Sequence, residues 1–157
     1  MTRMEFNPAT LDKIQQLITA NFAGRDELYA AARSLDNDAR QRVCQRLAEH
    51  LAGQAVELQQ ILTASGQRPT GPLDMNWLAD ALFESAKRAG GERGVLHTAV
   101  VCEQTLKEGY DRALDDLSHP QAENVLKRQR DGVEFGEQVL RGMETPGERK
   151  GRPKKAP

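Results

Sequence analysis

The chain has 157 residues, which suits a single domain with a hydrophobic core. Aromatic residues make up only 4% of it and the dominant residues are good helix formers, so an all-α protein is favoured over a β-sheet protein. The net charge is −1, but the last ten residues carry five basic residues and one glutamate, so a basic tail follows a mildly acidic body.

The first helix is predicted from Pro8, because Asn7 is a typical N-cap and proline is favoured at the first helical position. Apolar residues then recur at steps of three and four up to Leu35, as one face of a helix requires. A turn at 36–38 precedes a second helix with its own apolar face, and Gly66 is placed to end that helix.

Residues 67–73 are predicted to form a loop, since they include two prolines and a glycine. A short helix through Trp77 and Phe83 follows, and the glycines of segment 90–94 interrupt it. A third long helix is predicted from about residue 94 to Leu117.

The fourth helix follows a turn in which His119 acts as a cap or turn residue, and it ends before Pro146. The elements predict an all-α fold: an antiparallel four-helix bundle, made of two helical hairpins, over residues 8–145. The short extra helix lies in the connection between the second and third helices. The tail, residues 146–157, has no apolar residue that could anchor it and is predicted to be disordered.

Two cysteines, Cys44 and Cys102, lie in separate predicted helices without a C-x-x-C motif, which predicts two reduced, partly buried thiols. No apolar run approaches the ~18 residues of a membrane span, and the N-terminus lacks the apolar core of a signal peptide. We therefore expect a cytoplasmic protein without a membrane partner.

Three helical segments carry a family resemblance: Asp26–Ala31 (DELYAA), Gln45–Leu58 (QRLAEHLAGQAVEL) and Glu103–Leu114 (EQTLKEGYDRAL), with Trp77 also in place. Over about residues 11–143 the chain resembles a bacterial family of ferritin-like four-helix-bundle proteins of uncharacterised function. The resemblance implies a ferritin-like fold, and the wider superfamily includes iron oxidases. The family often has a histidine late in the fourth helix, where this chain has Glu137.

Each long helix carries a glutamate, as the helices of di-iron bundles do: Glu27, Glu57, Glu103 and Glu137. Such a centre also needs two Glu-x-x-His motifs, and none of the three histidines has a glutamate three residues before it. At ~1.5 Å per residue from each turn, Glu103 and Glu137 are level, whereas Glu27 and Glu57 differ in height by about 16 Å. Iron binding by Glu103 and Glu137 is therefore the metal alternative that remains.

Glu103 lies on the apolar stripe of its helix and is predicted to point inward, where a carboxylate needs a partner. Arg25 is one candidate partner, and an ion pair or hydrogen bond that fixes the register of the helices is the simpler alternative to a metal ligand. Tyr29 and Tyr110 are predicted to be core residues with satisfied hydroxyl groups. Trp77 is predicted to seal one end of the bundle.

The tail resembles an AT-hook, whose core would be Gly151, Arg152 and Pro153. Four basic residues flank that core: Arg149, Lys150, Lys154 and Lys155. An arginine inserted into a narrow A·T-rich minor groove meets a strong negative potential, and flanking cations contact phosphates. Contact with A·T-rich DNA is one prediction for the tail, and added solubility is the other.

Three functional hypotheses remain. The first is a non-enzymatic, ferritin-like helical protein without a cofactor, which acts by association, for example as a homodimer. The second is weak binding or oxidation of iron by carboxylates in the bundle. The third is association with DNA through the tail.

Overall fold

The computed structural model describes residues 6–115 and 117–144, and these residues form four helices and no strand. The helices are α1 (Pro8–Arg33), α2 (Asp38–Ala64), α3 (Asn76–Asp115) and α4 (Pro120–Glu144). The all-α prediction is confirmed. None of these helices combines the length and the hydrophobicity that crossing a bilayer requires.

The helix ends follow from local chemistry. Asn7 and Asn37 cap α1 and α2, because their side chains accept hydrogen bonds of 2.8 and 2.9 Å from amides three residues further on. After α2, Gly66 adopts a φ of 84°, the left-handed conformation that ends many helices. His119 Nδ1 accepts a 3.2 Å hydrogen bond from the Ala122 amide at the start of α4, as a cap does.

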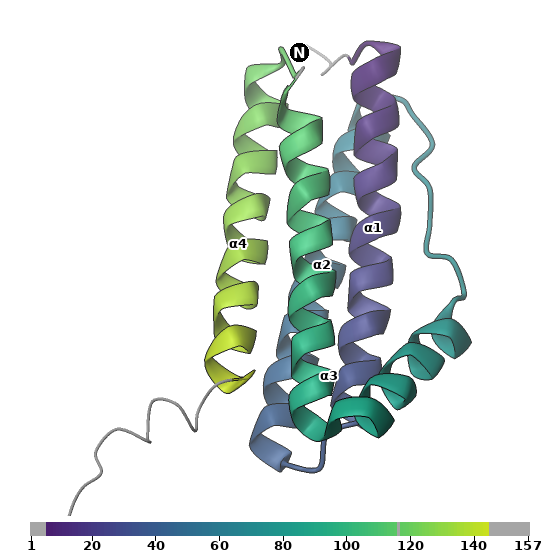
Figure 1. Ribbon diagram of the computed structural model, residues 1–157. Coiled ribbons are helices and arrows are strands. Elements are labelled where there is room, and N and C mark those ends of the chain that lie inside the picture. The colour runs from purple at the N-terminus through teal and green to yellow at the C-terminus, as the bar shows by residue number, and fades with distance from the viewer. Residues whose placement is uncertain (1–5, 116, 145–157) are drawn as a thin grey trace, which may run out of the picture.

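The helices lie side by side along one long axis (Figure 1). α1 packs against α2 and α3, and α3 packs against α4. In Figure 1 the chain descends through α1, rises through α2, returns down the outside in the connection 65–75, and then rises through most of α3 before descending through α4. The amide of Gln15 holds this connection to α1, since it donates to the Arg68 carbonyl at 3.0 Å and accepts from the Thr70 amide at 2.7 Å.

The core is formed by apolar faces from all four helices. Its largest fully buried side chains are Tyr110, Phe83, Ile14, Ile18, Leu28, Leu35, Leu51, Leu58, Leu62, Leu96, Leu126 and Leu140. Burial of each such aliphatic side chain contributes roughly 1.5–3 kcal/mol, so this shared core is the main source of stability. Cys44 is buried and Cys102 partly buried, and both are free thiols, as predicted.

α3 is sharply kinked at Gly91, whose φ of 65° and ψ of −155° lie in a region that essentially only glycine adopts. The residues before the kink, 76–90, leave the other helices at an angle, and we call them the arm (Figure 1). The predicted separate short helix is therefore the first part of α3, and the kink at Gly91 divides it from the rest of that helix. Gly94 is also constrained, because a Cβ there would lie 2.6 Å from the Ala86 carbonyl oxygen.

The arm is fixed on its inner side. Ala79 and Phe83 are buried there. Two ion pairs add to this attachment: Arg33 with Asp80 at 2.6 Å and Lys87 with Asp36 at 3.2 Å. Just after the kink, Arg40 pairs with Glu92 at 3.0 Å. Trp77, however, is 68% exposed, so the prediction that it seals one end is wrong.

Replacing Gly91 by alanine is expected to lower the free energy of unfolding by about 1–3 kcal/mol, because a Cβ disfavours this backbone conformation. The matched control is Gly90→Ala, at a position where φ is not positive and an added Cβ would meet no atom within 4 Å. That control should be neutral or stabilising by up to about 1 kcal/mol. Urea unfolding of both variants measures the difference, and equal stabilities would refute a role for the kink.

Candidate functional site

Glu103 lies in the core and is 1% exposed, so its predicted inward orientation is confirmed. Its Oε2 atom has no hydrogen-bond partner in the described structure, and its Oε1 atom faces Gly136 on α4, where a Cβ would lie 3.1 Å away. Burial, with smaller contributions from the charges of Glu27 and Glu137, raises the pKa of Glu103 to about 8. The neutral carboxylic acid therefore predominates at pH 7.

The expected partner of Glu103, Arg25, pairs elsewhere. Its guanidinium group forms a 2.9 Å ion pair with Asp26 and lies 4.9 Å above the centre of the Phe22 ring. Asp26 is itself buried, and it therefore needs the nearby cation that the preceding residue supplies.

Glu137 is 5% exposed, more deeply buried than its position beside the apolar stripe implied. Arg141 donates two hydrogen bonds to its Oε2 atom, at 2.9 and 2.8 Å, and Gln104 donates a third at 3.3 Å. Lys107 Nζ lies 3.0 Å from Oε1, close enough for an ion pair although not in hydrogen-bond geometry. Burial opposes ionisation, but Arg141, Lys107 and Gln104 together outweigh it and lower the pKa of Glu137.

The two glutamates predicted as an iron pair thus differ in charge state. No group of three or more His, Cys, Asp or Glu side chains within residues 6–115 and 117–144 is placed to hold a metal ion. Glu137 is already neutralised by two cations, which would repel a metal ion, so this donor set does not fit a ferritin-like iron centre. Iron binding at Glu103 and Glu137 stays a prediction that these contacts do not favour.

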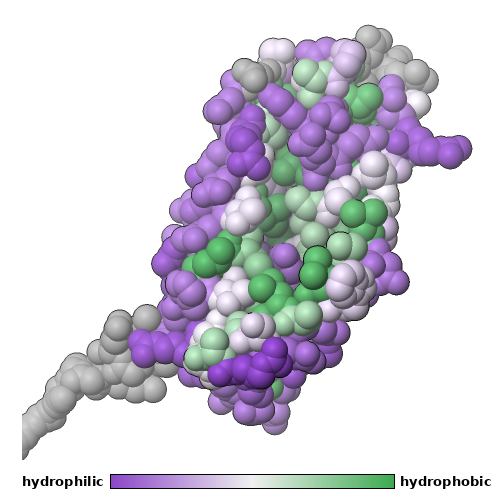
Figure 2. Space-filling model, turned by 45° about the vertical axis from the view of Figure 1, so that its right-hand side comes forward, coloured by the Kyte–Doolittle hydropathy of each residue, from purple (hydrophilic) through white to green (hydrophobic). Residues whose placement is uncertain are grey.

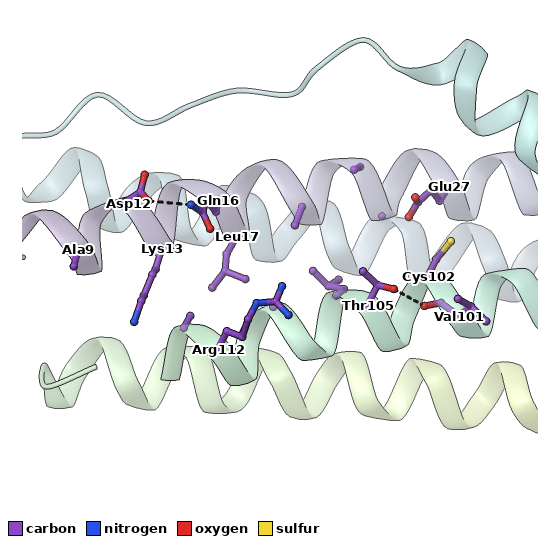
Figure 3. Close-up of a pocket in the computed structure, with 16 residues that line it drawn as sticks. Ala9, Asp12, Lys13, Gln16, Leu17, Glu27, Val101, Cys102, Thr105 and Arg112 are labelled. Carbon is purple, nitrogen blue, oxygen red and sulfur yellow. Dashed lines mark hydrogen bonds between the residues drawn. The ribbon is translucent and has the colours of Figure 1, made fainter. Parts of the chain in front are cut away.

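Glu27 and Cys102 lie near each other between α1 and α3 (Figure 3). Burial raises the pKa of Glu27, although contact with the Cys102 thiol partly offsets this effect. Burial and the nearby Glu103 raise the pKa of Cys44 to about 12, and burial with Glu27 raises that of Cys102. Both thiols are therefore protonated and poor nucleophiles at neutral pH.

A buried hydrogen-bond network joins all four helices around the Tyr110 hydroxyl. Asn21 Nδ2 on α1 donates to this hydroxyl at 2.8 Å, and Gln54 Nε2 on α2 donates to it at 3.2 Å and to Asn21 Oδ1 at 2.9 Å. The hydroxyl in turn donates to Gln129 Oε1 on α4 at 2.7 Å. The satisfied hydroxyl predicted for Tyr110 is confirmed, and this network, rather than Glu103, links the register of the helices.

The network reaches the surface through Glu57. Gln129 Nε2 donates to Glu57 Oε1 at 2.8 Å, and Arg128 binds the same carboxylate from α4. Hydrogen bonds from Arg128 lower the pKa of Glu57.

Sequence reasoning missed Asn21, although it lies seven residues after Ile14 and thus on the same buried face of α1.

The arm carries the second candidate site. Five of the eight large hydrophobic side chains that are exposed in the described structure lie on it or just before it: Leu73, Met75, Trp77, Leu78 and Leu82. Figure 2 shows one face of the molecule, on which hydrophobic and neutral residues form a band between hydrophilic borders. The charged residues Arg33, Asp80, Glu84, Lys87 and Arg88 line a shallow depression along the arm.

The residues predicted to contact DNA, 149–155, lie outside the described part of the chain. Comparisons of the sequence and structure with protein-family models, with curated proteins and with solved structures found no match.

Proposed function

We propose that this protein acts by association, and that two copies bind each other through their arms. The observation that carries this proposal is the concentration of exposed apolar side chains on a segment whose inner side is firmly anchored. Apolar patches of this kind are uncommon on surfaces that serve no interaction. Trp77, the only tryptophan of the chain, is 68% exposed there, and tryptophans frequently dominate the energy of interfaces.

The arm is also complementary to itself. Its acidic residues, Asp80 and Glu84, precede its basic residues, Lys87 and Arg88. A two-fold axis brings identical surfaces together, so two arms related by it can run antiparallel. Glu84 of one copy then faces Arg88 of the other, and Leu78 and Leu82 lie towards the outer parts of this contact.

The fold that we propose for this association module is an antiparallel four-helix bundle of the ferritin-like kind. The single long crossover between α2 and α3 supports it, because ferritin-like folds have one such connection. The arm directly follows that crossover at the start of α3, so the bundle serves as the scaffold that positions the contact surface.

Replacing Leu78 by aspartate is expected to weaken dimerisation at least tenfold, because it places a charge in the apolar contact. Analytical ultracentrifugation over a range of protein concentrations measures this change. The matched control is Val56→Asp on α2, since Val56 is 43% exposed, much like Leu78 at 47%, but lies off the arm. A wild-type protein that remains monomeric at high concentration would refute the proposal.

A charge exchange tests the antiparallel geometry. Glu84→Arg alone should weaken the dimer, because it sets arginine against Arg88 of the other copy. The double variant Glu84→Arg/Arg88→Glu restores both pairs and should recover most of the wild-type affinity. If the double variant is as weak as the single one, the arms do not pair in this way.

A further inference from the structure

A groove of about 590 Å³ runs between α1 and α3, away from the arm (Figure 3). Small residues line much of it: Ala20, Ala23, Gly24, Gly109 and Ala113. Leu17, Val101 and Leu106 add apolar walls. The length along α1 from Lys13 to Glu27 is about 21 Å at 1.5 Å per residue, so the groove is long.

The two ends of the groove differ in charge. Lys13 and Arg112 lie at one end, on opposite helices, with Asp12 and Gln16 beside them (Figure 3). Arg112 Nη2 lies 3.8 Å from the position of a Cβ on Gly109, so the guanidinium group extends over the groove. Two cations and one carboxylate line this end, and the carboxylate, Asp12, accepts a 2.9 Å hydrogen bond from Gln16.

The opposite end holds Glu27 and Cys102. Burial raises the pKa of both side chains, which favours their neutral forms. The groove therefore combines a charged end, an apolar middle and an end with reduced charge.

We propose that this groove binds a single-chain amphiphile with an anionic head group, such as a long-chain fatty acid. The head group pairs with Arg112, and the unbranched alkyl chain lies along the small residues towards Glu27 and Cys102. Mostly apolar pockets with a few placed polar groups are the usual form of small-molecule sites.

Fluorescence titration of the full chain with cis-parinaric acid tests this proposal. We expect saturable binding of one probe per protein molecule and displacement by palmitate. Displacement by hexadecanol should be much weaker, because it has the same alkyl chain but no charge. Arg112→Gln should weaken binding about tenfold, since it removes a charge-assisted hydrogen bond. Its matched control is Arg46→Gln, an exposed arginine on α2, which should leave binding unchanged.

A second test fills the groove with a larger side chain. Ala23→Leu should reduce affinity at least tenfold, and because Ala23 is exposed, the variant should fold normally. Ala39→Leu, at an exposed position of α2, serves as its control. Equal displacement by hexadecanol and palmitate would overturn recognition of the head group. Binding only to phosphatidylglycerol vesicles, only to a helical peptide, or no saturable binding at all would overturn the proposal, while Leu78→Asp should bind normally because the arm is separate.

Discussion

Replacing Glu103 by methionine is expected to stabilise the protein by on the order of 4 kcal/mol at pH 9 and by much less at pH 4. The side chain is 1% exposed, and its Oε2 atom is without a hydrogen-bond partner in the described structure, so burial of the charged form is costly. Methionine has a similar length and adapts well to irregular core spaces.

The dependence on pH follows from the raised pKa of Glu103, about 8 in the folded protein against an ordinary value of 4.5. Below pH 4.5 the carboxyl group is neutral in both the folded and the unfolded chain and imposes no penalty. Between pH 4.5 and 8 only the unfolded chain ionises, so the stability of the wild type falls as pH rises. At about 1.4 kcal/mol for each pH unit, the loss is bounded near 5 kcal/mol, and it stays constant above pH 8.

Urea denaturation of both proteins at pH 4, 6, 7.5 and 9 measures this effect. Other carboxyl groups titrate in both proteins, so the difference between the two stability curves isolates Glu103. Glu108→Met, at an exposed position five residues further along α3, is the control and should show little change at any pH. A difference that does not grow between pH 4 and pH 9 would show that Glu103 is ionised in the folded protein.

Replacing Tyr110 by phenylalanine is expected to lower the free energy of unfolding by about 2–4 kcal/mol, because removing the hydroxyl leaves buried polar groups unsatisfied. Gln129 Oε1 loses its donor, and Asn21 Nδ2 loses one of its two acceptors. The packing of the ring is retained, so the loss measures the network alone.

The matched control for this change is Tyr29→Phe. Tyr29 is partly exposed on α1 and forms no hydrogen bond with the described residues, so its variant should stay within about 0.5 kcal/mol of the wild type. Chemical denaturation gives both values at one pH. If the two variants were equally stable, the contacts of the Tyr110 hydroxyl would contribute nothing beyond those it makes with water when unfolded.

Local features of the structure could be predicted from sequence because they depend on neighbouring residues. The caps at Asn7 and Asn37 lie within three residues of the amides that they satisfy. The inward orientation of Glu103 follows from its place on one apolar stripe, and the same pattern places Tyr110 in the core.

Partners across helices could not be predicted, because they depend on how each helix is rotated about its own axis. Glu137 lies beside its stripe, yet the approach of α3 buries it and supplies Lys107. Arg25 finds its partner in the adjacent residue, which a search between helices overlooks. The prediction for Trp77 was wrong because the arm has apolar residues on two sides, and the sequence does not say which side packs against the other helices.

The contact between Glu57 and Gln129 has a consequence for the direction of the hydrogen bonds around the Tyr110 hydroxyl. An ionised carboxylate can only accept, so Glu57 turns the NH₂ group of Gln129 towards itself and the amide oxygen towards Tyr110. The tyrosine must then donate to that oxygen and use its lone pairs for Asn21 and Gln54. One negative charge at the rim thereby orients the dipoles of side chains from four helices.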